Sequence, residues 1–221
     1  MVGGIIQAIG WAFLPLLAWP FIHLIYGQKP IVRSFSEALI SLIDGLTFRL
    51  GEIAKWLLPL LVLSVAASVF ALSIFGVTTT KWLESAKYFQ SLVIMLGAAA
   101  TLLAGQHVRV DIFHMRMGEM GKARVDLIGY FLLLMPVCIL LTWKAQGFVS
   151  SAWAIREGSG EADGIRGVYI LKTLIPIFAL TMLAQGLAIA TRAAMSLSGQ
   201  TRPKRPKGVP PFFKVNSEDT L

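Results

Sequence analysis

Histidine, aspartate and arginine cluster in a short polar stretch, residues 105–113, between two long apolar segments. His107, Asp111 and His114 stand at positions i, i+4 and i+7, so on a helix they would share one face. Two imidazoles and a carboxylate on one face could bind a transition metal. The alternative is that they form hydrogen bonds and salt bridges at a membrane surface. We expect this second role and no metal site, because imidazoles are common near membrane surfaces.

Arg109 lies inside the same stretch. Residues two positions apart on a helix do not face each other, so Arg109 and Asp111 are each expected to pair elsewhere. Candidates for Asp111 are Lys122 or Arg124 after a turn, or a residue of a partner subunit. We therefore expect the stretch to fix a helix end at the membrane surface or to contact another subunit.

A second pair of opposite charges consists of Glu157, in a polar and glycine-rich segment, and Lys172, about one turn inside the last apolar segment. Lys172 can extend along the helix and keep its ammonium group in water. It can instead form an ion pair with Glu157 or contact another subunit, and such pairing would offset the cost of a charge inside the membrane. The sequence leaves both alternatives open.

The composition of the chain indicates the class of protein to which these residues belong. Of the 221 residues, 56% are hydrophobic and 14% are charged, whereas soluble domains carry roughly 25% charged residues. The apolar residues gather in blocks about as long as a bilayer is thick. The sequence therefore predicts an all-α polytopic membrane protein. The net charge of +8 lies at the ends of these blocks and in the tail, which indicates contact with anionic membrane lipids and no nucleic acid.

Four apolar blocks predict the core transmembrane helices, over residues 57–77, 88–104, 127–148 and 169–190. Pro136 falls inside the third block and predicts a kink there. Residues 97–100 of the second block read Gly-Ala-Ala-Ala, a surface of small side chains that lets helices approach closely.

Two further elements precede these helices. Residues 2–26 contain no charged side chain and predict an apolar helix that either spans the bilayer or lies at its surface. Residues 28–52 combine charges with apolar residues at helical spacing, which predicts an amphipathic helix at the membrane surface. The expected domains are the N-terminal helices at 1–44, a four-helix membrane domain at 45–194 and a basic, disordered tail at 195–221. Because most of the 20 Lys and Arg residues fall on one side, we expect a cytoplasmic C-terminus.

No signature of catalysis is present in the sequence. It lacks a glycine-rich phosphate loop and a nucleophile motif, so we expect no enzyme activity and no bound cofactor. A four-helix chain without a polar midplane site or a pair of broken helices is a poor transporter by itself, which favours a helper subunit.

The alternative is a membrane-anchored cofactor-binding subunit, or a structural assembly subunit, of another inner-membrane complex. His23, His107 and His114 could be cofactor ligands. They do not form the facing pair inside two spans that a haem held by two histidines needs.

Motifs in an ordered series resemble the small membrane subunit (the Q-type small permease subunit) of TRAP transporters, most closely the branch labelled mannitol/chloroaromatic compound. The first motif is residues 95–99 followed by the His-Val-Arg-Val-Asp core at 107–111, and the second is residues 125–129 followed by Pro136. The third consists of residues 151–153, residues 157–159 and Gly164. The fourth consists of Leu171, Lys172, Pro176 and residues 185–187. The resemblance covers residues 45–194. Residues 70–73 depart from it by lacking an Arg-Tyr pair, and the usual glutamine is missing between Trp82 and Glu84.

The resemblance implies a place in a sodium-coupled symporter for an organic acid or a related small solute. The chain would bind a large membrane subunit that carries the substrate and sodium sites, and a periplasmic binding protein would deliver the substrate. It would act as a scaffold in the bacterial inner membrane. The candidate structural or subunit-interface residues are Trp82, Glu84, His107, Arg109, Asp111, Glu157 and Lys172, and none is expected to be catalytic.

Overall fold

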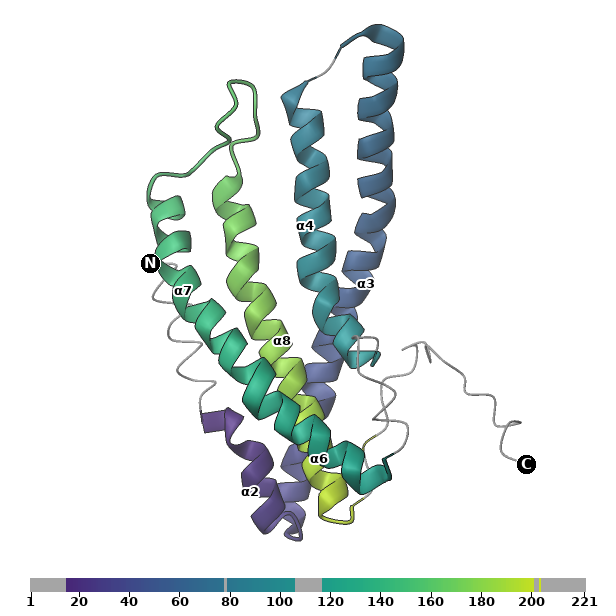
Figure 1. Cartoon of the computed structure of the whole chain (residues 1–221), viewed down its shortest axis with the longest axis vertical. Coiled ribbons are helices and arrows are strands. Elements are labelled where there is room, and N and C mark those ends of the chain that lie inside the picture. Colours follow the sequence, from purple (N-terminus) through teal and green to yellow (C-terminus); the bar gives the residue numbers. More distant parts are fainter. Residues whose placement is uncertain (1–14, 78, 106–116, 201–202, 204–221) are drawn as a thin grey trace, which may run out of the picture.

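The computed structural model describes residues 15–77, 79–105, 117–200 and 203 (Figure 1). All elements of this part of the chain are helical: α2 (Trp19–Tyr26), α3 (Pro30–Phe75), α4 (Thr80–Leu103), α6 (Glu119–Gly129), the π-helical turn η1 (Tyr130–Leu134), α7 (Met135–Ala154) and α8 (Val168–Leu197). Four helical stretches are long and apolar enough to cross a membrane. The predicted class, an all-α polytopic membrane protein, is confirmed.

The longest helix, α3, has physical start and stop signals at its two ends. Pro30 stands in its first turn, where the missing N–H removes no helical hydrogen bond. It ends at Gly76, whose φ of 63° suits glycine and whose N–H donates to the Leu72 carbonyl at 3.1 Å. Its 46 residues correspond to about 69 Å, more than twice the roughly 30 Å hydrocarbon core of a bilayer.

This continuous helix corrects the expectation of a separate surface helix over residues 28–52. Both that segment and the first predicted span belong to α3. Trp56 and the charges at Arg49 and Lys55 are typical of a membrane boundary, but a boundary does not by itself break a helix. Pro59, expected near a helix start, lies inside α3, where it removes one backbone donor and the helix continues. The predicted domain boundary at residue 44 also falls within this helix.

α4 packs against α3 through the small side chains that predicted a close approach. A Cβ built on Gly51 of α3 would lie 2.5 Å from the Ala100 Cβ, and one built on Gly97 of α4 would lie 3.6 Å from the Ala54 Cβ. The two backbones are therefore close because neither helix carries a large side chain at the contact. The structure identifies α3 as the partner of this surface.

The helix predicted around Pro136 is longer than expected and contains a local widening. α6, η1 and α7 follow one another without a loop from Glu119 to Ala154. The π turn ends at Leu134, and the Met135 N–H bonds back to the Tyr130 carbonyl. Since Pro136 has no N–H to donate one turn back, a wider turn before it accommodates the ring where a kink was predicted.

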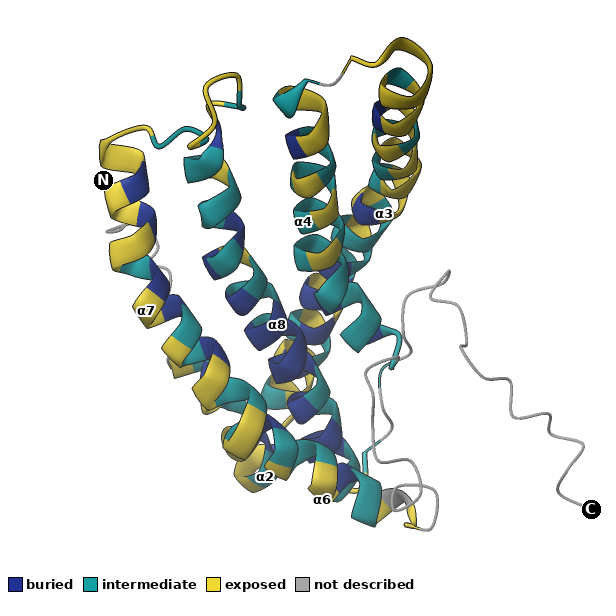
Figure 2. Cartoon of the chain, turned by 45° about the horizontal axis from the view of Figure 1, so that its top comes forward, coloured by how far each residue is buried: buried dark blue, intermediate teal, exposed yellow. Residues whose placement is uncertain are grey.

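The core of the bundle lies along α8 (Figure 2). This helix contacts α2, α3, α4, α6, η1 and α7, and most of the buried apolar residues of the chain lie on it or face it. Its buried positions from Ala179 to Met195 include many alanines and Gly186, which allow several helices to pack around one axis. α3 and α7, in contrast, expose many large apolar side chains along their outer faces.

At the chain ends, the structure describes part of the predicted elements. α2 has eight residues, or about 12 Å, which is shorter than the hydrocarbon core of a bilayer. Residues 2–14 of the predicted apolar helix and most of the tail at 195–221 lie outside the described residues.

Candidate functional site

Glu84, in the first turns of α4, is the centre of a polar cluster at one end of the bundle. It is 9% exposed. Its carboxylate accepts a hydrogen bond from the Ser159 hydroxyl and another from the Ile165 N–H at 2.6 Å. Both donors belong to the loop between α7 and α8, residues 155–167. Glu84 therefore holds this loop against α4, and we call the arrangement the loop clasp.

The loop clasp has a second contact at the surface. The Lys81 ammonium lies 2.6 Å from the Asp163 carboxylate, and both side chains are more than half exposed. An exposed ion pair of this kind contributes little stability by itself. It does show that the start of α4 and the loop after α7 lie at the same end of the bundle.

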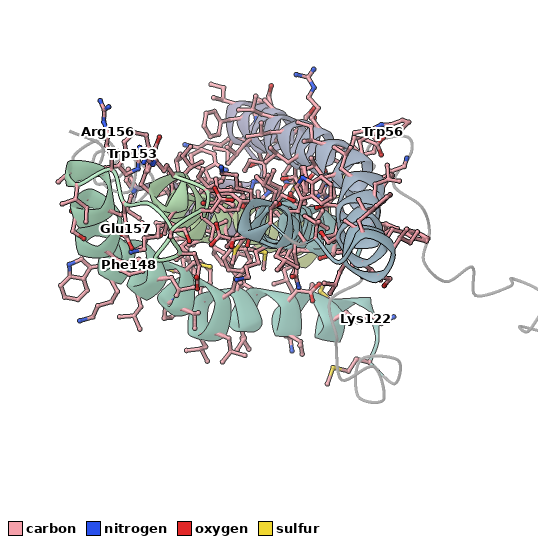
Figure 3. All side chains as sticks on the ribbon, turned by 90° about the horizontal axis from the view of Figure 1, so that it is seen from above. Trp56, Lys122, Phe148, Trp153, Arg156 and Glu157 are labelled. Atoms are coloured by element: carbon pink, nitrogen blue, oxygen red, sulfur yellow. The ribbon has the colours of Figure 1, made fainter. Side chains whose placement is uncertain are left out.

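On the α7–α8 side, the same loop is held by Glu157 and Lys172. The Lys172 ammonium lies 2.5 Å from the Glu157 carboxylate and 3.9 Å from the centre of the Phe148 ring (Figure 3 labels Glu157 and Phe148). Of the alternatives for Lys172, the structure shows the ion pair. Nearby, the Trp153 indole donates to the Thr173 hydroxyl at 2.9 Å, which further joins α7 to α8.

The loop needs a compact backbone to bring Ser159 and Ile165 to one carboxylate. The Ser159 N–H donates to the Ile165 carbonyl at 3.1 Å, which brings the two residues side by side. A Cβ built on Gly164 would overlap the Ser159 side chain and lie 2.9 Å from a Glu84 oxygen. Glycine is therefore required at position 164 by this close approach. Arg156, where the chain leaves α7, has a φ of 48°, which is uncommon outside glycine.

The remaining sequence-predicted residues are not part of this cluster. Trp82 lies in the first turn of α4 and is 49% exposed, so its indole is available to lipid or to a partner. His107, Arg109, Asp111 and His114 lie outside the described residues. Among the residues that the structure does describe, no group of three His, Cys, Asp or Glu side chains could hold a metal ion.

A second buried polar cluster, at the other end of the bundle, was missed by the sequence reasoning. The Asp44 carboxylate of α3 binds the Arg192 guanidinium of α8 through two nitrogens, and the Gln185 amide donates to it at 3.1 Å. Asp44 is 1% exposed and Gln185 is fully buried. One signal was available: Asp44 stands one turn after Ile40 and next to Ile43, on the apolar face of its helix.

Chemically, these clusters consist of charges that the chain satisfies itself. Asp44 and Glu84 are the buried carboxylates among the described residues, and both are bound by donors of other helices or loops. Cys138 is a buried free thiol inside α7, which fits a packing role. The arrangement connects helices, and its two carboxylates are already engaged, whereas the Arg192 Nε and the Gln185 side-chain oxygen are buried without a hydrogen-bond partner in the described part of the chain.

A comparison with models of protein families adds the decisive observation. The family described as "Tripartite ATP-independent periplasmic transporters, DctQ component" matches residues 61–195. The chain belongs to the DctQ family. The matched region runs from the middle of α3 to the end of α8, so it includes both Glu84 and Arg192. A search of curated proteins and a search of solved structures each found no match for the chain.

Membership in the DctQ family has direct consequences for the class of protein. The DctQ family consists of components of tripartite transporters, and it is not a family of enzymes. The four helices that are long and apolar enough to cross a membrane agree with a multi-pass component of such a transporter. The broader resemblance to the small subunit of TRAP transporters is therefore confirmed at the level of the family.

Proposed function

We propose that this DctQ chain is the scaffold subunit of a sodium-coupled TRAP symporter for an organic acid or a related small solute, of the mannitol/chloroaromatic-compound branch. In this proposal it lies in the bacterial inner membrane with its C-terminus in the cytoplasm. It binds a large membrane subunit, which carries the substrate and sodium sites, and a periplasmic binding protein delivers the substrate.

One observation carries the scaffold role: the buried charges of the described chain are engaged in contacts between helices. A transport site needs polar groups that can exchange protein partners for a substrate or an ion. Asp44 instead holds α3 to α8, and Glu84 holds the loop at 155–167 to α4. Breaking either contact would leave a buried charge without a partner, which is costly. These groups therefore favour a rigid body over a moving one.

The outer surfaces of the bundle suit a larger partner in the membrane. Along the second half of α3, large apolar side chains are exposed away from the side that packs on α4, among them Leu58, Val62, Leu63, Phe70 and Ile74. η1 and α7 together expose a similar row, which includes Leu132 and Leu133 of η1 and Val137 and Trp143 of α7. Such surfaces face lipid or another membrane subunit. We assign part of this area to the large subunit and the rest to lipid.

The orientation proposed here rests on charge. Most Lys and Arg residues lie at the end of the bundle that contains Asp44 and Arg192, or in the segments connected to it. The loop clasp around Glu84 is then on the periplasmic side. There it is available to the binding protein, whereas the basic tail faces the anionic cytoplasmic leaflet.

Co-purification tests the assembly directly. The chain would be expressed with an affinity tag, together with the large-subunit gene of its own transporter, and purified in mild detergent. We expect a complex of fixed stoichiometry. Recovery of the tagged chain alone, with the large subunit present in the same membranes, would contradict the proposal. A haem absorbance band in the purified chain would instead support a cofactor-binding subunit.

A further inference from the structure

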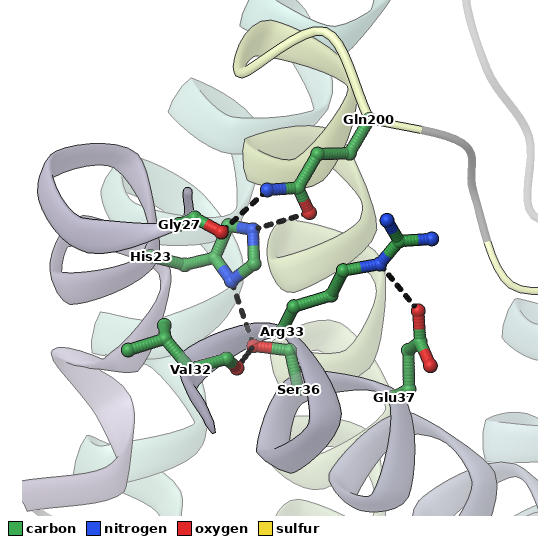
Figure 4. A network of polar contacts seen from close by, with 7 residues as sticks. All are labelled: His23, Gly27, Val32, Arg33, Ser36, Glu37 and Gln200. Atoms are coloured by element: carbon green, nitrogen blue, oxygen red, sulfur yellow. Dashed lines mark hydrogen bonds and ion pairs between the residues drawn. The ribbon is translucent and has the colours of Figure 1, made fainter. Parts of the chain in front are cut away.

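A third polar cluster joins three segments at the same end of the bundle as Asp44 (Figure 4). Its centre is His23 of α2, which is fully buried. The His23 Nδ1 lies 2.7 Å from the hydroxyl of Ser36 in α3, and the Nε2 lies 3.2 Å from the side-chain oxygen of Gln200. Gln200 follows α8 in the chain. His23 thus connects α2, α3 and the exit of α8.

The proton on Nε2 is fixed by Gln200. The Gln200 amide nitrogen donates to the Gly27 carbonyl at 2.5 Å, so its oxygen must be the atom that faces His23. An amide turned the other way would place two carbonyl oxygens together. Because the oxygen of Gln200 can only accept, Nε2 of His23 carries a hydrogen.

Whether the Nδ1 of His23 carries a proton determines which acceptor the Ser36 hydroxyl donates to. The Ser36 oxygen receives the Trp19 indole N–H at 2.9 Å and has one hydrogen of its own to donate. Two acceptors compete for that hydrogen: the Val32 carbonyl at 2.9 Å and the His23 Nδ1 at 2.7 Å. With neutral His23, Ser36 donates to Nδ1. If Nδ1 gains a proton, the bond reverses and Ser36 donates to Val32.

Within the described part of the chain, the added proton would therefore find a hydrogen-bond acceptor but no counter-ion. Apart from His23, α2 carries no titratable residue other than Tyr26. From α3 the charged neighbours are Arg33 and Glu37, which pair with each other at 2.9 Å. From η1 the contact is the apolar Phe131, through Phe21. After α8 the contact is the Gln200 amide, and Arg192 is bound to Asp44.

We propose that His23 is a proton-sensitive latch, which holds α2 and α3 to the chain leaving α8 while its imidazole is neutral and releases them when the imidazole is protonated. The latch is supported by a second contact, from the Gln28 amide to the Ser198 carbonyl at 3.3 Å. A Cβ built on Gly27 would lie 2.9 Å from the His23 Nε2, so the ring packs closely against the Gly27 backbone and a side chain at that position would push the ring away.

The direction of the pH dependence follows from burial. Burial lowers the pKa of His23 below its ordinary value of 6.5, and this outweighs the opposing effect of the Gln200 hydrogen bond. Once the latch is open the pKa returns to about 6.5, so the open state binds more protons than the closed state. The latch is therefore fully closed above pH 6.5 and weakens as the pH falls from 6.5 toward the lowered pKa.

Amide hydrogen exchange of the full chain in lipid nanodiscs tests the latch. Exchange rates would be measured at about pH 7.5 and about pH 5.5 and corrected for the intrinsic pH dependence of exchange. We expect peptides covering residues 17–28 and 195–200 to lose protection together at the lower pH, by at most about tenfold per pH unit. In His23→Gln their protection should not depend on pH. His107→Gln combined with His114→Gln should keep the wild-type profile.

An unchanged protection of these peptides in the wild-type chain would overturn the latch, as would the same pH profile in His23→Gln. If His23→Gln fails to fold, the imidazole itself can be followed by ¹⁵N NMR in the chain that lacks His107 and His114. A neutral ring with its proton on Nε2, titrating below pH 6.5, supports the proposal. A proton on Nδ1, or titration above that value, contradicts it.

Discussion

Asp44 and Arg192 form a buried ion pair between α3 and α8, although 148 positions separate them in the sequence. Their side chains are 2% and 11% exposed. The guanidinium contacts both carboxylate oxygens, and the Gln185 amide donates a further hydrogen bond to the same carboxylate. This pair fixes the N-terminal half of the longest helix to the central helix, so it should be a main determinant of how rigid the bundle is.

Removing one charge of this pair should destabilise the chain strongly. Asp44→Asn leaves Arg192 as a buried cation without a carboxylate, and we expect a loss of about 3 kcal/mol in the free energy of unfolding. The measurement is SDS-induced unfolding in mixed micelles. Glu52→Gln is the matched control on α3, because the Glu52–Lys55 pair is exposed, and should change stability by at most about 0.5 kcal/mol. Equal losses in the two variants would refute a special role for Asp44.

Gly186 of α8 should not tolerate a methyl group. A Cβ there would overlap the Leu134 side chain and lie 2.8 Å from the Tyr130 ring, both in the π turn. We expect Gly186→Ala to cost about 1–3 kcal/mol through overpacking. Gly147→Ala on α7 meets open space and should be neutral or stabilising by up to about 1 kcal/mol. The same unfolding assay compares the two, and a stable Gly186→Ala chain would show that α8 and η1 can separate without loss.

The loop clasp should be disrupted by a methyl group at Gly164, as the contact between α8 and η1 is by one at Gly186. Gly164→Ala would push Ser159 away from Glu84, whereas Gly160→Ala in the same loop meets open space. We expect cleavage of the 155–167 loop by a protease added outside to become about tenfold faster in Gly164→Ala, since a clasp contact is worth roughly 1.4 kcal/mol. Gly160→Ala should be cleaved at the wild-type rate. Similar rates in both variants would mean that the clasp does not order the loop.

The polar stretch at 105–113 gives a prediction about assembly. Arg109→Ala and Asp111→Ala are expected to lower the yield of the complex with the large subunit, and to leave the affinity of the binding protein for its substrate unchanged. The yield is measured by co-purification and the affinity by titration of the isolated binding protein. Normal complex yield in both variants would contradict an assembly role for this stretch.

The sequence predicted the class of fold because length and hydropathy alone determine where a chain can cross a bilayer. It predicted a surface helix over residues 28–52 separate from the span at 57–77, whereas the structure has one helix there, since charges mark a membrane surface without stopping a helix. The pair of Glu157 and Lys172 could be named from sequence as one of two alternatives, because the two residues flank one helix start. Asp44 and Arg192 could not, because the contact depends on how α3 crosses α8, which hydropathy does not specify.

Glu84 shows a further limit of sequence reasoning. It was singled out by family resemblance, and its partners, Ser159 and the Ile165 N–H, lie 75 and 81 positions away in a loop. Only the folded path of that loop brings a hydroxyl and a backbone amide to one carboxylate. His23 was considered only as a cofactor ligand, and its role as a connection between segments follows from Ser36 and Gln200.

The most direct test of the scaffold account is solute uptake into proteoliposomes, with an inward sodium gradient and the binding protein added outside. Three preparations are compared: this DctQ chain alone, the large subunit alone, and the two together. The account predicts uptake only when both subunits are present, and its loss when choline replaces sodium. Sodium-driven uptake by the DctQ chain alone would contradict it.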